Sequence, residues 1–428
     1  MAKILVALRS NIIWDKKNPL AIDAFYEGLL KKLVEHGNDV LFLRINDFRC
    51  VNKHISMVHK FSPNLIITPN NDIPEKLLKA TSCPIALINA DSPDYYLNKQ
   101  YIKENLDRYY FFHHDQVMFY TDAICKIFGA KRSQNYFFGN ATIIQAERLP
   151  IKNNIVFMGT LGWTDAVKTL FVECDDDQDL REFWDEFEKG TTLPENYKFY
   201  YLQALTSNNR IKTLDAISDL GLKLYGFKQQ FKELIPYSIN LLKCYDITPM
   251  YSVEDIQNEF NQSLIAPTLY NAQARGGYSW RVVDVMASSA CLISPPSISL
   301  QQEFQFIPIY NSPSEARELC IKLINDNSFR SDIVCKSNTI IEEKYRFENC
   351  FKRLEEATGI KILNNSTTGK LNAMYNVKKE VISRIPLKLE LSLMSIPLFF
   401  HFLPFFNRNR VVKKINLIRE KLLRKRKR

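Results

Sequence analysis

Short apolar runs alternate with amphipathic stretches along the first third of the chain. The apolar runs cover residues 3–8, 39–44, 64–70, 84–90 and 108–114. A helical pattern occupies residues 21–36 and ends at Gly37. Unbroken apolar runs are typical of strands that are buried on both faces, and their alternation with helices indicates a parallel sheet covered on both sides. The pattern therefore predicts a Rossmann-like α/β domain.

The same alternation returns in the second part of the chain. We expect strands at 153–159, 222–227, 263–269, 291–295 and 306–310, and helices within 164–205 and at 280–289, 313–325 and 331–358. The polar residues 364–370 are typical of a linker. The sequence thus predicts two Rossmann-like domains, 1–150 and 151–362, that face a cleft, followed by a linker and tail at 363–428.

The composition is consistent with two hydrophobic cores and with a protein that resides in a reducing compartment. The chain has 428 residues, of which 46% are apolar, and single cores rarely grow beyond about 300 residues. Its nine cysteines are scattered without a CxxC pair, which indicates reduced thiols of a cytosolic protein. The apolar run at the N-terminus is too short for a signal peptide, and no apolar run approaches the ~20 residues of a spanning helix. We expect a cytoplasmic protein.

The positive net charge belongs to one segment. Residues 407–428 hold 11 of the 57 Lys and Arg and one of the 47 acidic residues, which leaves 46 of each sign in residues 1–406. A nucleic-acid-binding domain needs basic residues spread over a face of the fold. The neutral body gives no such surface, so no nucleic acid is expected as a partner.

The segment just before this basic tail is apolar and aromatic. Residues 396–406 contain five Phe and two Pro, too few residues to span a bilayer but enough for shallow insertion. Cations near an anionic leaflet contribute about 1 kcal/mol each. We predict that Ile396 to Arg428 binds an anionic membrane surface, as a peripheral attachment to the inner face of the cell membrane. Two alternatives are that the apolar segment packs on the body while the tail is solvated, and that the tail binds RNA.

The adjacent pair Gly276 and Gly277 is the first candidate for chemistry. These glycines and Ser279 precede a predicted helix, where backbone N–H groups and the helix dipole favour an anion. Arg281 can bind phosphate in a bidentate manner, and Asp284 lies one turn later on the same face, where it can accept ribose hydroxyls. The alternative is that Arg281 and Asp284 form an ion pair beside an ordinary glycine turn.

Several blocks follow one another within roughly residues 60–355. They are INADSPD (88–94), YYFFHHD (109–115), TDAICKIFGA (121–130), YFFGNAT (136–142), IVFMGT (155–160), the stretch 208–226, YSVEDIQNEFNQSLIAPTL (251–269) and GGYSWRVVDVMASSACLIS (276–294). Their order and spacing resemble those of the CgeB-like, spore-maturation-type bacterial glycosyltransferases of the GT-B group. The last block is similar to the family's donor-site pattern Arg-x-x-Glu-x-x-x-x-Gly. It departs from that pattern at Asp284, where the family has Glu, and at Ser289, where the family has Gly.

The resemblance implies a nucleotide-sugar donor, held without a metal or other cofactor. Donor contacts are expected from Gly276, Gly277, Ser279 and Arg281, with Gly159 and Arg210 from neighbouring loops. Tyr225 and Gly226 lie where such folds hold the nucleobase. For Gly159 and Gly226, a tight turn at the end of a strand is an equal alternative.

An inverting transfer needs a general base from the first domain, whereas a retaining transfer needs none. Asp91 and Asp115 directly follow apolar strands, at the edge where open α/β sheets bind ligands, and they are the candidates for this base; Asp94, His113 and His114 lie nearby. Capping or turn roles remain open for each of them. His113 and His114 are adjacent and point to opposite sides of a strand, which argues against a metal site. The acidic run 172–179 precedes a helical pattern and is better explained by N-capping than by metal binding.

Taken together, the sequence predicts a glycosyltransferase that moves a sugar to a lipid-linked or cell-surface polysaccharide precursor. A non-catalytic membrane scaffold with this fold and a sugar-nucleotide epimerase of the same fold are the alternatives.

Overall fold

The computed structural model describes most of the chain. The described residues are 1–9, 24–45, 51–143, 146–147, 149–161, 195–226, 230–231, 234, 238–248, 250, 252–274, 276–364 and 369–376. All of them belong to one compact unit, Met1–Lys378. The acidic run 172–179 and the segment 396–428 lie outside the described residues.

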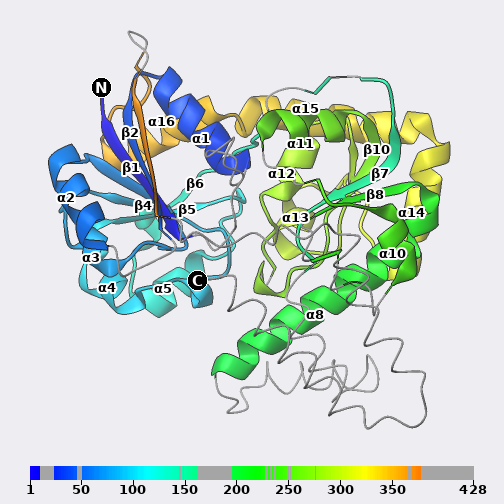
Figure 1. The fold of residues 1–428 in the computed structure, drawn as a ribbon, viewed down its shortest axis with the longest axis horizontal. Helices are drawn as coiled ribbons and strands as arrows, with labels where there is room; N and C mark the ends of the chain where they lie inside the picture. Colours follow the sequence, from blue (N-terminus) through cyan, green and yellow to red (C-terminus); the bar gives the residue numbers. More distant parts are fainter. Residues whose placement is uncertain are drawn as a thin grey trace, which may run out of the picture. The chain divides into compact units, whose positions relative to one another are not determined.

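The first domain is built on a seven-stranded sheet in which every pair of neighbouring strands is parallel (Figure 1). Its strand order is β12-β2-β1-β3-β4-β5-β6. The strands are β1 Lys3–Arg9, β2 Asp39–Ile45, β3 Leu65–Pro69, β4 Ile85–Ile88, β5 Tyr109–His113, β6 Asn135–Phe137 and β12 Leu371–Asn376. The helices of this domain include α1 Ala24–Glu35, α2 Val51–Phe61, α3 Glu75–Leu78, α4 Lys99–Glu104 and α5 Thr121–Phe128. The five strands predicted in the first third of the chain are confirmed.

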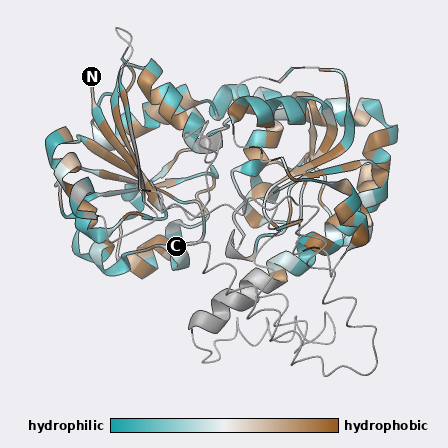
Figure 2. Cartoon of the chain, viewed as in Figure 1, coloured by the Kyte–Doolittle hydropathy of each residue, from teal (hydrophilic) through white to brown (hydrophobic). Residues whose placement is uncertain are grey.

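Successive residues of the central strands enter different cores. Ile4 and Val6 of β1 belong to the core that contains α1, whereas Leu5 and Ala7 belong to the core under α2 and α3. All five residues of β3 are buried. Figure 2 shows apolar strands between helices whose outer faces are polar. Burial of both faces explains why these strands have unbroken apolar sequences.

The second domain is built on a five-stranded sheet of order β11-β10-β7-β8-β9, also parallel throughout. Its strands are β7 Asn153–Met158, β8 Leu222–Tyr225, β9 Tyr245–Asp246, β10 Ser263–Pro267 and β11 Cys291–Ile293. Its helices are α8 Glu195–Ala216, α10 Ile239–Cys244, α11 Val253–Asn261, α12 Arg281–Met286, α13 Ile298–Glu303, α14 Pro313–Asn325 and α15 Asn327–Lys344.

The prediction of a strand at 306–310 is wrong. This segment contacts the sheet through a single bridge between Ser294 and Ile309. Pro308 lacks an N–H and can only accept a ladder hydrogen bond, here from the N–H of Ser294 at 3.2 Å. The apolar side chains that suggested a strand fill the core instead, where Ile307 and Tyr310 are buried.

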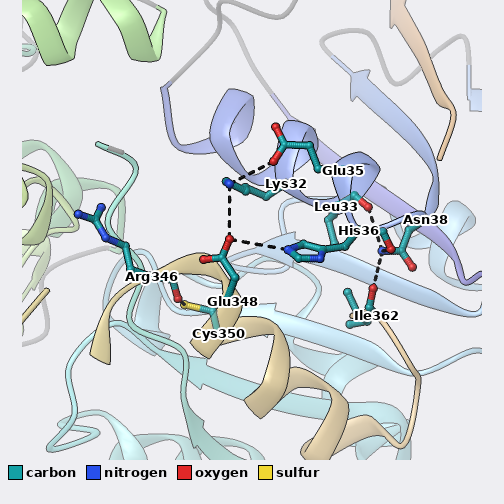
Figure 3. Close-up of polar contacts among 9 residues, drawn as sticks. All are labelled: Lys32, Leu33, Glu35, His36, Asn38, Arg346, Glu348, Cys350 and Ile362. Atoms are coloured by element: carbon teal, nitrogen blue, oxygen red, sulfur yellow. Dashed lines mark hydrogen bonds and ion pairs between the residues drawn. The ribbon is translucent and has the colours of Figure 1, made fainter. Parts of the chain in front are cut away.

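After α15 the chain returns to the first domain. The helix predicted over 331–358 is broken at Tyr345, and α16 (Phe347–Thr358) packs Cys350 and Phe351 into the core beneath α1. Figure 3 shows the polar contacts at this junction: the carboxylate of Glu348 lies 3.4 Å from Nζ of Lys32 and 3.7 Å from Nε2 of His36.

The described chain then closes the edge of the first sheet. The side-chain amide of Asn38 donates to the carbonyl of Ile362 at 2.9 Å, and the N–H of Gly369 donates to that of Val34 at 2.8 Å (Figure 3 for Asn38). A Cβ at Gly369 would overlap the backbone of Asn38, so this position requires glycine. β12 then pairs with β2. The prediction that all of 363–428 lies outside both domains is therefore wrong for 371–376.

None of the helices in the described part of the chain is both long and apolar enough to cross a membrane.

Candidate functional site

A small pocket lies at the carboxyl ends of β10 and β11, where open parallel sheets bind ligands. It encloses about 90 Å³, room for a phosphate-sized group. The described residues that line it are 268–271, Ala274, 276–279, Val282 and 294–297. The candidate donor residues Gly276, Gly277 and Ser279 are thus brought together around one pocket.

The glycine pair lies against two aromatic side chains of the first domain. Gly276 has a φ of +105°, and a Cβ there would lie 2.6 Å from Cζ of Phe119. A Cβ at Gly277 would lie 2.6 Å from the hydroxyl oxygen of Tyr120. That hydroxyl donates a hydrogen bond to the carbonyl of Ala274. Glycine at both positions therefore leaves room for Phe119 and Tyr120 where the two domains approach closely.

The backbone of the glycine pair is also engaged locally. The N–H of Gly277 donates to the carbonyl of Ala274 at 2.9 Å, and the carbonyl of Gly276 accepts from the N–H of Ser299 at 3.0 Å. The Gly277 amide is thus committed to the turn. Ser279, which follows in the same loop, also lines the pocket.

Arg281 and Asp284 form the ion pair that was the alternative to a donor site. Nη1 of Arg281 lies 3.5 Å from Oδ2 of Asp284, and its guanidinium stacks over the ring of Phe260 at 5.8 Å. The buried Asp284 accepts, through Oδ1, the N–H of Thr142 at 2.7 Å. Thr142 lies on the connection between the two domains. Neither Arg281 nor Asp284 is among the residues that line the pocket.

Arg210 on α8 donates hydrogen bonds to the segments that follow two strands, β10 and β7. Its Nε donates to the carbonyl of Tyr270, a residue of the pocket, at 2.8 Å, and its Nη1 donates to the carbonyl of Thr160 after β7 at 2.7 Å. Burial lowers the pKa of Arg210 to about 10, while Tyr310 and Asp91 act in the opposite direction. The guanidinium therefore stays positive at neutral pH beside the pocket.

Asp91 lies in the first domain, just after β4, and its charge is coupled to that of Arg210. Burial raises the pKa of Asp91, while a hydrogen bond from Asn70 and the nearby Arg210 act to lower it. Nδ2 of the Asn70 side chain donates to Oδ2 of Asp91 at 2.8 Å. Oδ1 of the same side chain accepts hydrogen bonds from the backbone N–H groups of Ala90 and Asp91. Asn70 has a left-handed backbone with φ of 45°. It fixes the turn that presents Asp91, and its position after β3 is the only feature of the sequence that could have indicated this role.

Asp115, the second candidate base, is buried after β5. Its Oδ1 accepts the N–H of Phe119 at 2.8 Å. Burial raises the pKa of Asp115 to about 6, the hydrogen bond from Phe119 opposes this rise, and the carboxylate of Glu303 adds to it. The carboxylate of Asp115 thus stabilises its own turn, a role that the sequence left open.

The remaining candidates lie at strand ends of the second domain. Gly159 is exposed after β7, and its carbonyl accepts from the side-chain amide of Gln230 at 3.4 Å. Tyr225 ends β8 and is buried, and burial raises its pKa. A Cβ at Gly226 would overlap the hydroxyl of Tyr245, so a close approach explains this glycine. None of these three residues is among those that line the pocket.

The two adjacent histidines are buried side chains of the first domain. Nε2 of His113 lies 2.9 Å from Oδ1 of Asn135, and the ring of His114 packs edge-on against Trp280. Burial lowers the pKa of His113 to about 4 and that of His114 to about 3. Within the described ranges, no three His, Cys, Asp or Glu side chains are grouped as metal ligands would be.

The two parallel sheets, the chain's return to the first domain and a pocket at the carboxyl edge define an α/β protein with the GT-B fold. No known family model matches the sequence, and no curated protein matches it. Solved structures do match. Anabaena Alr3699/HepE, solved in complex with UDP-glucose, has a TM-score of 0.50 at 10% identity and covers 84% of this chain and 100% of its own.

Two further solved structures are glycosyltransferases. A glycosyltransferase from Rickettsia africae ESF-5 has a TM-score of 0.46 at 11% identity over 85% of this chain and 99% of its own. WaaG, a glycosyltransferase involved in lipopolysaccharide biosynthesis, has a TM-score of 0.49 at 8% identity over 83% of this chain and 100% of its own. At these identities the likeness to Alr3699/HepE shows the fold.

Proposed function

We propose that this protein is a glycosyltransferase of the CgeB-like group that uses a nucleotide-sugar donor. The observation that carries the proposal is the placement of Arg210. It contacts Tyr270, which lines the pocket of the second domain, and is electrostatically coupled to Asp91 of the first. A cation beside a phosphate-sized pocket and a carboxylate in the other domain are the two charges that an inverting glycosyl transfer needs.

On the donor side, Arg210 stabilises the departing diphosphate. Guanidinium groups bind phosphate oxygens through charge-assisted hydrogen bonds, and fixed donors placed where charge develops are a large source of catalysis. Two backbone carbonyls hold Arg210 in place, so little reorganisation is needed. Ser279 and the loop around Gly276 and Gly277 shape the pocket for the phosphates. No metal ion is required in this scheme.

On the acceptor side, Asp91 acts as the general base. Its carboxylate takes the proton of the acceptor hydroxyl while that oxygen attacks the anomeric carbon, and the bond to the nucleoside diphosphate breaks. Burial raises the basicity of Asp91, and Asn70 fixes its orientation. Asp115 is the less suitable base because its carboxylate already holds the turn at Phe119.

The acceptor in this proposal is a lipid-linked or cell-surface glycan precursor. It is supported by residues 396–428, whose aromatic segment and cations suit an anionic membrane surface. An enzyme held at the cytoplasmic face in this way shares a surface with a lipid-linked acceptor.

The test is binding and turnover with UDP-, GDP-, CMP- and ADP-linked sugars. Calorimetry should find one nucleotide class that binds. If the protein binds none of these nucleotide sugars, the proposal is wrong. Incubation with the donor alone, followed by NMR, separates the rival functions. An epimerase converts the donor sugar without an acceptor, whereas a scaffold leaves it unchanged even when an acceptor is added.

A further inference from the structure

Three hydrogen-bond donors from separate parts of the chain converge on the carboxylate of Glu303, the last residue of α13. Its Oε1 accepts the N–H of Val117 at 2.9 Å. Its Oε2 accepts the hydroxyls of Tyr278 at 2.8 Å and Tyr345 at 2.7 Å. A carboxylate with three donors is well satisfied, and hydrogen bonds to an ionised acceptor are about twice as strong as neutral ones.

The three donors belong to three segments at which the two domains meet. Val117 lies in the first-domain turn, which we define as residues 115–120. Tyr278 lies in the pocket loop, residues 276–279, and itself lines the pocket. Tyr345 lies at the break between α15 and α16, where the chain returns to the first domain. Both tyrosines are buried, so their hydroxyls depend on protein acceptors.

The first-domain turn and the pocket loop also touch directly. Phe119 and Tyr120 of the turn pack against Gly276 and Gly277 of the loop so closely that a Cβ on either glycine would overlap them. A displacement of the loop by a ligand must therefore move the turn, or break the bonds that Glu303 makes to both.

The surroundings of Glu303 leave room for the segments around it to move. A cavity of about 310 Å³ lies beside it, lined also by Gln116, Gln302 and Lys344. Nζ of Lys344 donates to Oε1 of Gln116 at 3.2 Å. The buried carboxyl of Asp115 is the nearby like charge, and burial raises the pKa of Glu303.

We propose that Glu303 is a positioning residue that couples the pocket loop to the first-domain turn, so that occupancy of the pocket is transmitted to the domain that supplies the acceptor carboxylate. The part of this inference that concerns the ligand rests on the proposed function. The coupling between the two segments does not, because it follows from contacts within the protein.

The experiment is hydrogen exchange by mass spectrometry on the full chain, with and without UDP. Glu303→Gln keeps the shape of the side chain but replaces one acceptor oxygen by a donor, so it cannot serve all three partners. In the ligand-free protein, this variant should speed exchange about tenfold in both the first-domain turn and the pocket loop, the change expected for loss of a charge-assisted bond. Tyr345→Phe should give a smaller effect of the same pattern. The control is Glu318→Gln, an exposed glutamate on α14, which should change neither segment.

The outcomes separate the two proposals. In the wild type, UDP should slow exchange in both segments, and in Glu303→Gln it should protect the pocket loop alone. Faster exchange of only one segment in ligand-free Glu303→Gln would overturn the coupling. Protection of the loop but not of the turn in the wild type would also overturn it. If UDP protects neither segment while the variant still loosens both, the coupling stands and UDP as the donor nucleotide fails.

Discussion

A Cβ added to Gly277 would lie 2.6 Å from the hydroxyl oxygen of Tyr120, a residue of the other domain. This contact explains why the chain, which has 13 glycines, places an adjacent pair here. The glycine pair allows the pocket loop to contact the first domain. The anion site that the sequence suggested would be a second function of the same loop. The contact also makes a direct prediction.

Gly277→Ala should lower the free energy of unfolding by about 1–3 kcal/mol, the usual cost of forcing a methyl group into a packed region. Gly277 does not have a positive φ, so the cost comes from the clash and not from backbone strain. Urea unfolding of the wild type, Gly277→Ala, Tyr120→Phe and the double variant gives the coupling energy. Because Tyr120→Phe removes the overlapping oxygen, the double variant should lose less than the sum of the single losses. Strict additivity would contradict the contact.

Arg210→Ala should weaken nucleotide binding by at least about tenfold, as expected when a hydrogen-bonded charge that contacts a phosphate is removed. Arg210→Lys should recover little, because one ammonium cannot bond both Thr160 and Tyr270 and still reach a ligand. The measurement is calorimetry with the nucleotide that binds the wild type.

Two other arginines sharpen this test. Arg132→Ala is the control, since Arg132 is exposed and pairs with Asp122. Arg281→Ala distinguishes the two donor-site placements. The sequence predicts a donor-site role for both arginines. If affinity falls in Arg281→Ala but not in Arg210→Ala, the phosphates lie at Arg281 and the placement at Arg210 is wrong.

The contacts that these two arginines make show what the sequence could and could not predict. The buried strands β1 to β5 were predictable because both faces are covered and their sequences are unbroken apolar runs. β12 was missed because LNAMYN is a short run of mixed polarity at the edge of the sheet. Arg281 stood out because it follows the glycine pair, but its partner Asp284 is one turn away on the same helix. The resemblance predicts Arg210 as a donor contact, but its partners Thr160 and Tyr270 lie 50 and 60 positions away in the sequence. Glu303 contacts Val117, which is 186 positions away, and no local pattern encodes such contacts.

Asp91→Asn should abolish transfer while nucleotide affinity stays within about twofold, because the amide keeps the size of the side chain but cannot accept a proton. In the wild type, the rate should rise with pH on the acid side with an apparent pKa above 3.8, since burial raises the pKa of Asp91. Asp94→Asn, at an exposed neighbour, is the control and should keep both rate and profile. Transfer that persists in Asp91→Asn would point to a retaining mechanism or to another base.

Asp115 should make folding stability depend on pH in an unusual direction. Its folded-state pKa of about 6 lies above the ordinary value of 3.8, so the folded protein holds this proton more tightly than the unfolded chain. The stabilising contribution is therefore present below about pH 4 and is lost as the pH rises through about 6. Urea unfolding at about pH 4.5 and about pH 7 should show that Asp115→Asn becomes more stable relative to the wild type at the higher pH. An equal difference at both values would mean that Asp115 does not titrate in this window.

Deletion of residues 396–428 should release the protein from anionic vesicles without changing nucleotide affinity. The 11 cations of residues 407–428 exceed the single acid there, whereas residues 1–406 are neutral in sum, so the attraction to an anionic surface is concentrated in the deleted part. Co-sedimentation with vesicles that contain phosphatidylglycerol, at low and at high salt, is the measurement. Full-length protein should sediment with the vesicles and be partly released by salt, because only the electrostatic part of the attachment is screened.

A variant with the five phenylalanines of 396–406 replaced by Ser should show weaker binding that salt abolishes. Binding of the full chain to structured RNA but not to vesicles would instead favour the RNA-binding alternative for this tail.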